Sequence, residues 1–137
     1  MRSPAVAALV AGSALLSACG GEKPAPPPQS TRPDTVTVTP AADGGQSVEI
    51  DADDGFRFHP STVRAEPGPI TVTLRHVGRG APHNWTIRQL PAAHTSLAAA
   101  GQSRSVRFTV SKPGDYRFVC TIHERQGQIG TLTVVAP

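Results

Sequence analysis

The residues with the most distinctive chemistry lie near the carboxyl terminus, in the segment Cys120-Thr-Ile-His123. A thiolate and an imidazole three positions apart, at the end of a strand, can converge on one ion where the backbone turns. A second imidazole, His83, lies just before another expected strand. One Cys and two His form the trigonal set of a blue-copper site, which adds a weak axial ligand. Zinc more often uses further Cys or carboxylate ligands in a closed tetrahedral set.

The elements that must position these ligands are β-strands. Apolar and polar residues alternate in runs rich in Val, Thr and Ile, as is typical of half-buried strands. The runs cover residues 47–52, 69–76, 84–88, 105–110, 116–120 and 130–135. Pro and Gly turn signals separate them. Several short strands with regular turns predict an all-β sandwich or barrel, with Trp85 in its core.

An export signal is predicted for residues 1–18. Arg2 precedes an apolar stretch from Ala5 to Leu16, and the small residues of Leu-Ser-Ala-Cys19 follow. This layout is typical of a secretory signal, and the stretch is too short for a stable membrane span. The ending resembles the lipobox of bacterial lipoproteins, which implies an acylated Cys19 and a membrane anchor through its lipid. An ordinary cleaved signal is the alternative.

A Pro-rich linker is predicted for residues 19–46. Six prolines lie between Pro24 and Pro40, with Ser, Thr, Ala and Gly among them. Such a stretch cannot bury enough apolar surface to offset the entropy of ordering, and Pro-rich spacers are semi-rigid and extended. We therefore expect a disordered tether that holds a domain of residues 47–137 away from a membrane.

The two cysteines of the chain have different expected fates. Exported proteins meet an oxidising environment in which paired cysteines form disulfides. If Cys19 is acylated, Cys120 has no partner and needs burial or a bound ion. A disulfide between the two is the alternative if the signal is not cut there, and a plain buried thiol is another.

Composition excludes several other classes of protein. The 137 residues allow one ordinary domain, and 13 Gly with 14 Pro stay below the level of a fully disordered chain. The net charge of +3 and the aromatic content of 4% do not favour nucleic acid. No 20-residue apolar run follows the N-terminus, so a polytopic membrane protein is excluded.

Two segments together resemble the cupredoxins, nearest to the plastocyanin and amicyanin branch. These segments are Pro82-His83-Asn84 and the stretch 116–134, in which two residues separate Cys120 from His123. The likeness covers residues 47–136 and implies a cupredoxin-like Greek-key β-sandwich or barrel.

The resemblance implies a role for each matching residue. His83, Cys120 and His123 are similar to the three strong copper ligands of the family. Asn84 is similar to the family residue that ties the two ligand loops together by hydrogen bonds. The other histidines are not expected to bind the copper ion: His59, His76 and His94.

The axial position departs from the family pattern. Cupredoxins usually place Met there, but Met1 is the only methionine of this chain. Gln128 is preferred because its frame, Gly-Gln-Ile-Gly, is similar to the Gly-Met-x-Gly of the family, while Gln126 has the amicyanin-like spacing. An amide oxygen is a harder donor than a thioether, so we expect it to favour Cu(II) and lower the reduction potential.

Together with the export signal and the lipobox-like ending, the resemblance implies an extracytoplasmic, lipid-anchored and monomeric carrier of single electrons with one type 1 copper ion. It is not expected to be an enzyme, because four protein ligands leave no open position for a substrate. Its partners would be redox proteins: a cytochrome, a respiratory or photosynthetic complex, or a copper enzyme. The alternatives are a module for copper storage, sensing or delivery, and a metal-free scaffold domain.

Overall fold

The structure is a computed structural model that describes residues 21, 23–26 and 28–137. The predicted signal segment 1–18 and Cys19 lie outside these residues. Within the described part of the chain, no helix is both long and apolar enough to cross a membrane.

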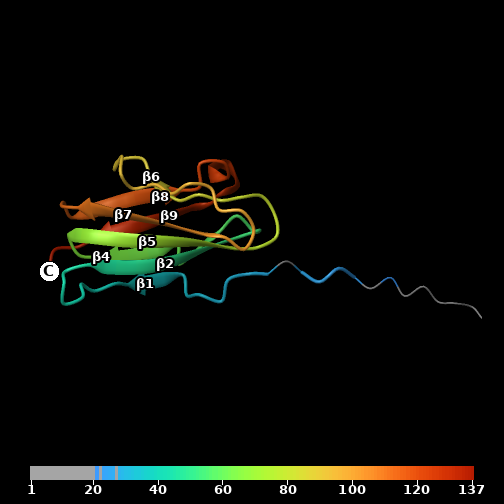
Figure 1. The fold of residues 1–137 in the computed structure, drawn as a ribbon, viewed down its shortest axis with the longest axis horizontal. Helices are drawn as coiled ribbons and strands as arrows, with labels where there is room; N and C mark the ends of the chain where they lie inside the picture. Colours follow the sequence, from blue (N-terminus) through green and yellow to red (C-terminus); the bar gives the residue numbers. More distant parts are fainter. Residues whose placement is uncertain (1–20, 22, 27) are drawn as a thin grey trace, which may run out of the picture.

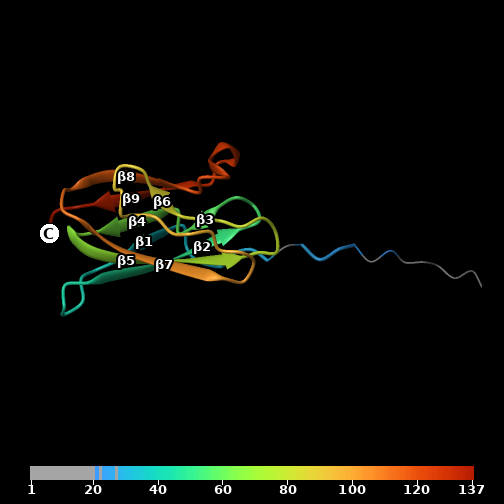
Figure 2. The same cartoon turned by 45° about the horizontal axis from the view of Figure 1, so that its top comes forward.

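Two β-sheets pack face to face, as Figures 1 and 2 show. The first has, in spatial order, β1 (Thr35–Thr37), β4 (Thr62–Ala65), β9 (Ile129–Val134), β8 (Gly114–Val119) and β6 (Thr86–Ile87). The second has β3 (Phe58–His59), β2 (Gln46–Asp53), β5 (Gly68–Val77) and β7 (Ser103–Val110). A single 3₁₀ turn, η1 (Glu124–Gln126), is the helical element of the described residues. The predicted all-β sandwich is confirmed.

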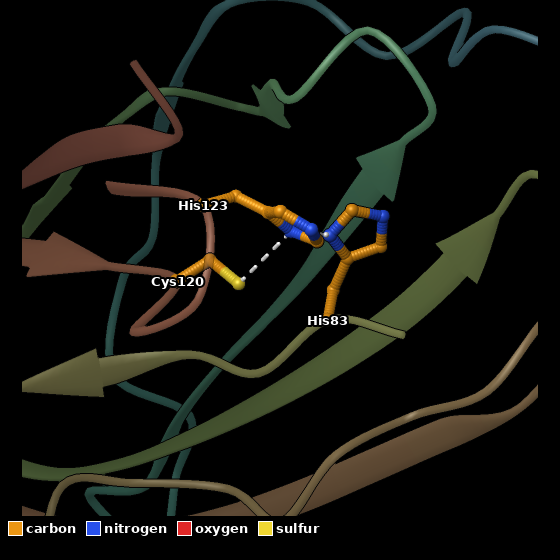
Figure 3. A group of neighbouring side chains, drawn as sticks. All are labelled: His83, Cys120 and His123. Atoms are coloured by element: carbon orange, nitrogen blue, oxygen red, sulfur yellow. Dashed lines mark hydrogen bonds between the residues drawn. The ribbon is translucent and has the colours of Figure 1, made fainter. Parts of the chain in front are cut away.

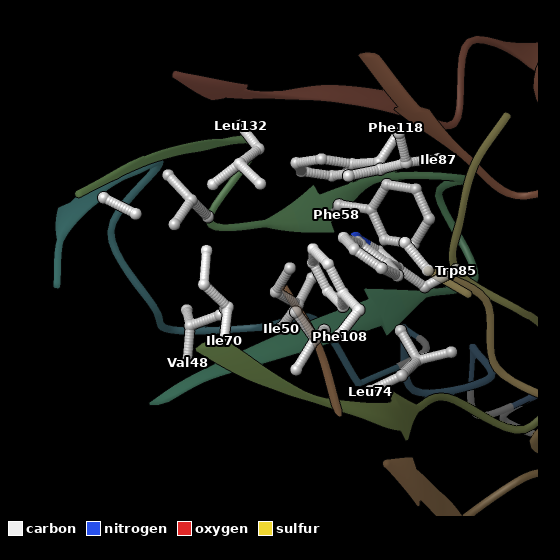
Figure 4. Packing of buried hydrophobic residues seen from close by; sticks show 14 of the residues in the cluster. Val48, Ile50, Phe58, Ile70, Leu74, Trp85, Ile87, Phe108, Phe118 and Leu132 are labelled. Carbon is white, nitrogen blue, oxygen red and sulfur yellow. The ribbon is translucent and has the colours of Figure 1, made fainter. Parts of the chain in front are cut away.

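The core lies between the two sheets because each strand turns alternate residues inward. In β5, Ile70, Val72 and Leu74 are buried while their sequence neighbours are half-exposed. Aromatic rings fill the middle of the sandwich, where Trp85 packs 5.7 Å from Phe108 between ring centroids (Figure 4). Trp85 is 1% exposed, so its predicted place in the core is confirmed.

The hairpin of β8 and β9 determines where the Cys120 loop lies. The two strands are antiparallel with Val119 opposite Ile129, so residues 120–128 form the connection at one end of the sandwich. Gly130 of β9 lets the Phe118 ring and the backbone of Ser61 approach this strand closely. A Cβ at Gly130 would lie 2.3 Å from the Phe118 ring and 2.5 Å from the backbone oxygen of Ser61.

The described end of the predicted linker is partly ordered, which corrects the expectation of a disordered tether up to residue 46. β1 pairs in parallel with β4, and Val36 packs against the core. Ahead of it, Arg32 forms ion pairs with Glu49 and Asp51. The prolines around β1 do not prevent this, since Thr-Val-Thr alternation supplies a half-buried edge strand. The described residues before Ser30 run away from the sandwich (Figure 1).

Candidate metal centre

The loop between β8 and β9 is closed by its own backbone, which brings three side chains to one place. The N–H of Cys120 donates to the backbone oxygen of Gln128 at 3.0 Å, and the N–H of Gln128 donates to that of His123 at 3.2 Å. Gly127 has a φ of 93°, a left-handed conformation that favours glycine. The turn thereby directs the side chains of Cys120, His123 and Gln128 inward, where all three are buried.

The fourth side chain comes from the segment between β5 and β6. The backbone of His83 pairs with Ala98: its N–H donates to the Ala98 oxygen at 3.1 Å, and its oxygen accepts the Ala98 N–H at 2.7 Å. These two bonds hold His83 at the end of the sandwich, where it is 1% exposed.

The ligand atoms converge, as Figure 3 shows for the three strong donors. Nδ1 of His123 lies 3.5 Å from Sγ of Cys120 and 3.1 Å from Nδ1 of His83. One ligand atom from each of the three residues lies within 4.8 Å of the others, and Cys120 has no disulfide partner among the described residues. Cys120 and His123 therefore face His83 across one small space, although they lie 37 and 40 positions away from it in the chain.

Gln128 completes this group and Gln126 does not. Oε1 of Gln128 lies 2.8 Å from Nδ1 of His83 and 3.2 Å from Nδ1 of His123. Its Nε2 faces the other way and donates to the backbone oxygen of Arg57 at 3.4 Å. Gln126 is exposed on η1. The site thus brings together two imidazole nitrogens, one sulfur and one amide oxygen.

Asn84 joins the two ligand segments. Its Oδ1 accepts the backbone N–H of Thr121 at 2.8 Å, and its Nδ2 donates to Oγ1 of the same residue at 2.9 Å. Because Asn84 follows His83 and Thr121 follows Cys120, these bonds hold the two segments at a constant separation.

Electrostatics suit the site for metal binding. Burial lowers the pKa of His83, so its ring stays neutral and can offer a lone pair. Glu124 lies in η1, in the same loop as Cys120. Its ion pair with Arg88 lowers the pKa of the Glu124 carboxyl. Glu124 also bonds Arg117 of β8 at 3.0 Å, which ties η1 to the strand that leads to Cys120.

The spacing between donors fits one shared ion. Two nitrogens that each bind an ion at about 2.0–2.1 Å, as in tetrahedral zinc sites, lie roughly 3.3 Å apart, and a sulfur at about 2.3 Å lies a few tenths of an ångström farther from them. The observed separations of 3.1 Å and 3.5 Å agree with this arrangement. The donor set of one Cys and two His is the type 1 copper set.

Comparison with known proteins decides the family. Residues 28–134 match the family described as the Cupredoxin-like domain. The chain is a cupredoxin. One curated relative is plastocyanin of Prochlorothrix hollandica, 34% identical over 86 residues. That match covers 56% of this cupredoxin and 62% of the plastocyanin. The family match begins before β1, so it includes the ordered segment ahead of residue 47.

Solved structures share the fold. Auracyanin A, described as a "blue" copper protein from Chloroflexus aurantiacus, superposes with a TM-score of 0.60 at 20% identity and covers 67% of this cupredoxin and 100% of that chain. A reduced auracyanin from Roseiflexus castenholzii gives 0.59 at 22%, with coverages of 65% and 96%. The metal-binding domain of the Cu(I)-exporting ATPase CopA of Streptococcus pneumoniae D39 gives 0.59 at 21%, with coverages of 73% and 96%. Copper is the cofactor that suits this cupredoxin, and its His83, Cys120 and His123 are placed to form a type 1 site.

The sequence pattern does not predict where some residues near the site lie. Phe56, with a φ of 57°, packs its ring 4.6 Å from that of His123 between centroids. Asp54 and His76 lie beside His83 in a second group of close polar side chains. The Asp-Asp-Gly-Phe sequence between β2 and β3 indicates a turn, and Phe56 lies in it. Nothing in the local sequence pattern links Asp54 with His76. His59 and His94 lie apart from the ligand atoms and bond Asp34 and the Pro91 oxygen respectively.

Proposed function

We propose that this cupredoxin carries single electrons through one type 1 copper ion held by His83, Cys120 and His123, with the amide oxygen of Gln128 as axial ligand. The observation that supports this most directly is the convergence of the three strong donors, with Nδ1 of His123 3.1 Å from Nδ1 of His83 and 3.5 Å from Sγ of Cys120. A soft thiolate suits Cu(I), while imidazole suits both oxidation states.

The protein's own contribution is a stiff ligand frame. When bound, copper supplies the one-electron redox couple. The backbone bond from Cys120 to Gln128 and the Asn84 bonds to Thr121 keep the donors in place while the charge changes. Burial of all four donor residues excludes water from them. A frame that does not rearrange keeps the barrier to electron transfer low.

Catalysis is not part of this proposal. Four protein groups would hold the ion and leave no open position, unlike a catalytic metal centre, which keeps one for water or substrate. The carrier therefore needs only contact with redox proteins, such as a cytochrome, a respiratory or photosynthetic complex, or a copper enzyme.

Electrons would leave through His123. Its exposed fraction is 7%, against 1% for His83, and it adjoins Ile122, which is 48% exposed. Encounters of redox proteins are typically small and short-lived. We expect a monomeric carrier that presents this end to its partners.

We also propose an extracytoplasmic location with a lipid on Cys19. The Leu-Ser-Ala-Cys motif and the Pro-rich segment that follows it support this proposal. Growth with labelled palmitate is expected to label the wild-type chain, whereas a Cys19→Ser chain should remain unlabelled. Label in both chains, or in neither, would contradict the anchor.

The main experiment is a visible and electron paramagnetic resonance spectrum of the purified full chain with Cu(II). An intense thiolate-to-copper band that is absent from Cys120→Ala is expected. Stopped-flow reduction and reoxidation should then cycle rapidly with copper retained. Loss of Cu(I) to an acceptor apoprotein would favour copper delivery instead, and a colourless chain that binds no copper would favour a scaffold domain.

A further inference from the structure

A histidine and a carboxylate are built into the wall behind His83. The side chain of His76 is 0% exposed, and its Nδ1 lies 3.2 Å from the backbone oxygen of Ala98, so the Nδ1–H donates there. Its Nε2 lies 3.5 Å from Oδ1 of Asp54. The Ala98 oxygen also accepts the N–H of His83, so the two histidines share one anchor.

The two rings are in contact. The rings of His76 and His83 meet edge to face, with centroids 4.5 Å apart and an interplanar angle of 80°. One ring nitrogen from each lies within 4.8 Å of the other and of a carboxylate oxygen of Asp54. Nε2 of His83 is buried and has no hydrogen-bond partner among the described residues.

This unpartnered nitrogen has a chemical consequence. When Nδ1 of His83 binds an ion, the proton of the neutral ring resides on Nε2. A buried N–H without an acceptor is costly, and histidines that bind metals almost always donate their second N–H to a carboxylate, carbonyl or water. Apart from the donor group itself, Asp54 and His76 are polar side chains that the structure places beside this ring.

Asp54 is itself held firmly. Its Oδ2 accepts the N–H of Arg79 at 2.9 Å, and its Oδ1 accepts the N–H of Gly80 at 3.0 Å. A Cβ on Gly78 would lie only 2.2 Å from Oδ1, so the loop wraps closely around the carboxylate. Since this loop leads directly to His83, Asp54 fixes both the neighbouring ring and the chain that carries the ligand.

We propose that Asp54 and His76 are positioning residues for the metal ligand His83: the ring contact with His76 fixes the orientation of the His83 ring, and in the copper-loaded protein the pair takes up the hydrogen bond that its Nε2–H lacks here. This inference rests on the proposed function, since it takes His83 as a copper ligand through Nδ1. The carboxylate also places a negative charge on the far side of the ligand. Negative charge near the site stabilises Cu(II) over Cu(I), so the pair lowers the reduction potential.

The first test is spectroscopic and uses the full chain loaded with Cu(I), which is diamagnetic. Nitrogen-15 NMR is expected to show a slowly exchanging Nε2–H of His83 in the wild type. His76→Phe keeps a ring but has no acceptor, so this signal should shift and exchange faster. His76→Gln keeps an acceptor and should restore part of the protection. His94→Gln is the matched control, because His94 also bonds a backbone oxygen but lies away from the ligands.

The second test measures the reduction potential by voltammetry. Asp54→Asn should raise it, while Asp43→Asn should leave it unchanged, since Asp43 bonds the N–H of Gly45 in a turn that carries no ligand. Urea unfolding identifies any variant that fails to fold, and Asp54→Asn then tests the pair independently of His76.

Two results would overturn the inference. One is that His76→Phe and Asp54→Asn both keep the NMR signal of the His83 Nε2–H and the reduction potential of the wild type. The other is a second equivalent of zinc or copper that binds the wild type and is lost in Asp54→Asn, which would make the pair a metal site. If the wild type itself gives no blue-copper spectrum, the proposed function fails, and this result is distinct from both.

Discussion

Oε1 of Gln128 lies 2.8 Å from Nδ1 of His83, although the two residues are 45 positions apart in the chain. The amide oxygen also lies 3.2 Å from Nδ1 of His123, while the amide nitrogen is turned toward the Arg57 oxygen. Gln128 therefore directs its amide oxygen toward both imidazole rings.

Gln128→Met is expected to raise the reduction potential, because a thioether favours Cu(I) more than an amide oxygen does. Voltammetry of the copper-loaded chain measures the change. Gln126→Met is the control and should match the wild type, since Gln126 is exposed on η1. Equal potentials in wild type and Gln128→Met would contradict an axial role for Gln128.

Cys120→Ser should abolish the intense visible absorption of the copper-loaded chain, because the band requires a thiolate donor. Absorption spectra at equal copper concentration measure the loss. Cys19→Ser should keep the full band. A wild type that lacks the band, together with a Cys19→Ser chain that shows it, would point instead to a disulfide between the two cysteines.

Asn84→Ala should destabilise the copper-free chain by about 1 kcal/mol, because it removes two hydrogen bonds to Thr121 and leaves a backbone N–H unpaired. Urea unfolding measures the change. Thr121→Val removes only the hydroxyl partner, so its loss should be smaller. A larger loss in Thr121→Val than in Asn84→Ala would mean that the backbone contact contributes little.

Gly130→Ala should cost about 1–3 kcal/mol of unfolding free energy, as overpacking does in tight cores. Its Cβ would meet the Phe118 ring at 2.3 Å and the backbone oxygen of Ser61 at 2.5 Å. Gly45→Ala serves as the control, because its Cβ meets only the flexible Asp43 side chain, at 3.2 Å. Thermal unfolding with equal losses in both variants would rule out the packing explanation.

Asp54 should make the copper-free fold sensitive to acid. The backbone N–H of Arg79 lowers the pKa of Asp54 below its ordinary value of 3.8. The ionised carboxylate thus stabilises the fold fully above the unfolded-state pKa, and this contribution is lost as the pH falls through the lower folded-state pKa. Urea unfolding from pH 6 down to acid should show a shallower decline for Asp54→Asn than for the wild type; parallel profiles would contradict this.

Much of the site was predictable because three of its donors are local in sequence. Cys120, His123 and Gln128 lie within a loop of nine residues, so their spacing alone indicates that one turn can bring them together. His83 could be added only through the resemblance, since its approach depends on the pairing with Ala98 and on the packing of two sheets.

The limits of prediction are clear at β1. With three residues, β1 is too short to show a periodic pattern. The strand forms because it pairs in parallel with β4, about 27 residues later in the chain. Local composition, rich in Pro and Thr, therefore indicated a linker. Asp54 and His76 were missed for a similar reason, because they are 22 positions apart and meet only where β5 lies beside β2.

The amino-acid sequence by itself determined the all-β class and the close spacing of Cys120, His123 and Gln128, because alternation and loop spacing are local properties. Only the tertiary structure decided that Gln128 rather than Gln126 faces His83, that residues before 47 join the sheet, and that a buried histidine and a partly exposed carboxylate lie beside His83. Those outcomes depend on contacts between distant segments, whose geometry is determined by packing of the whole core.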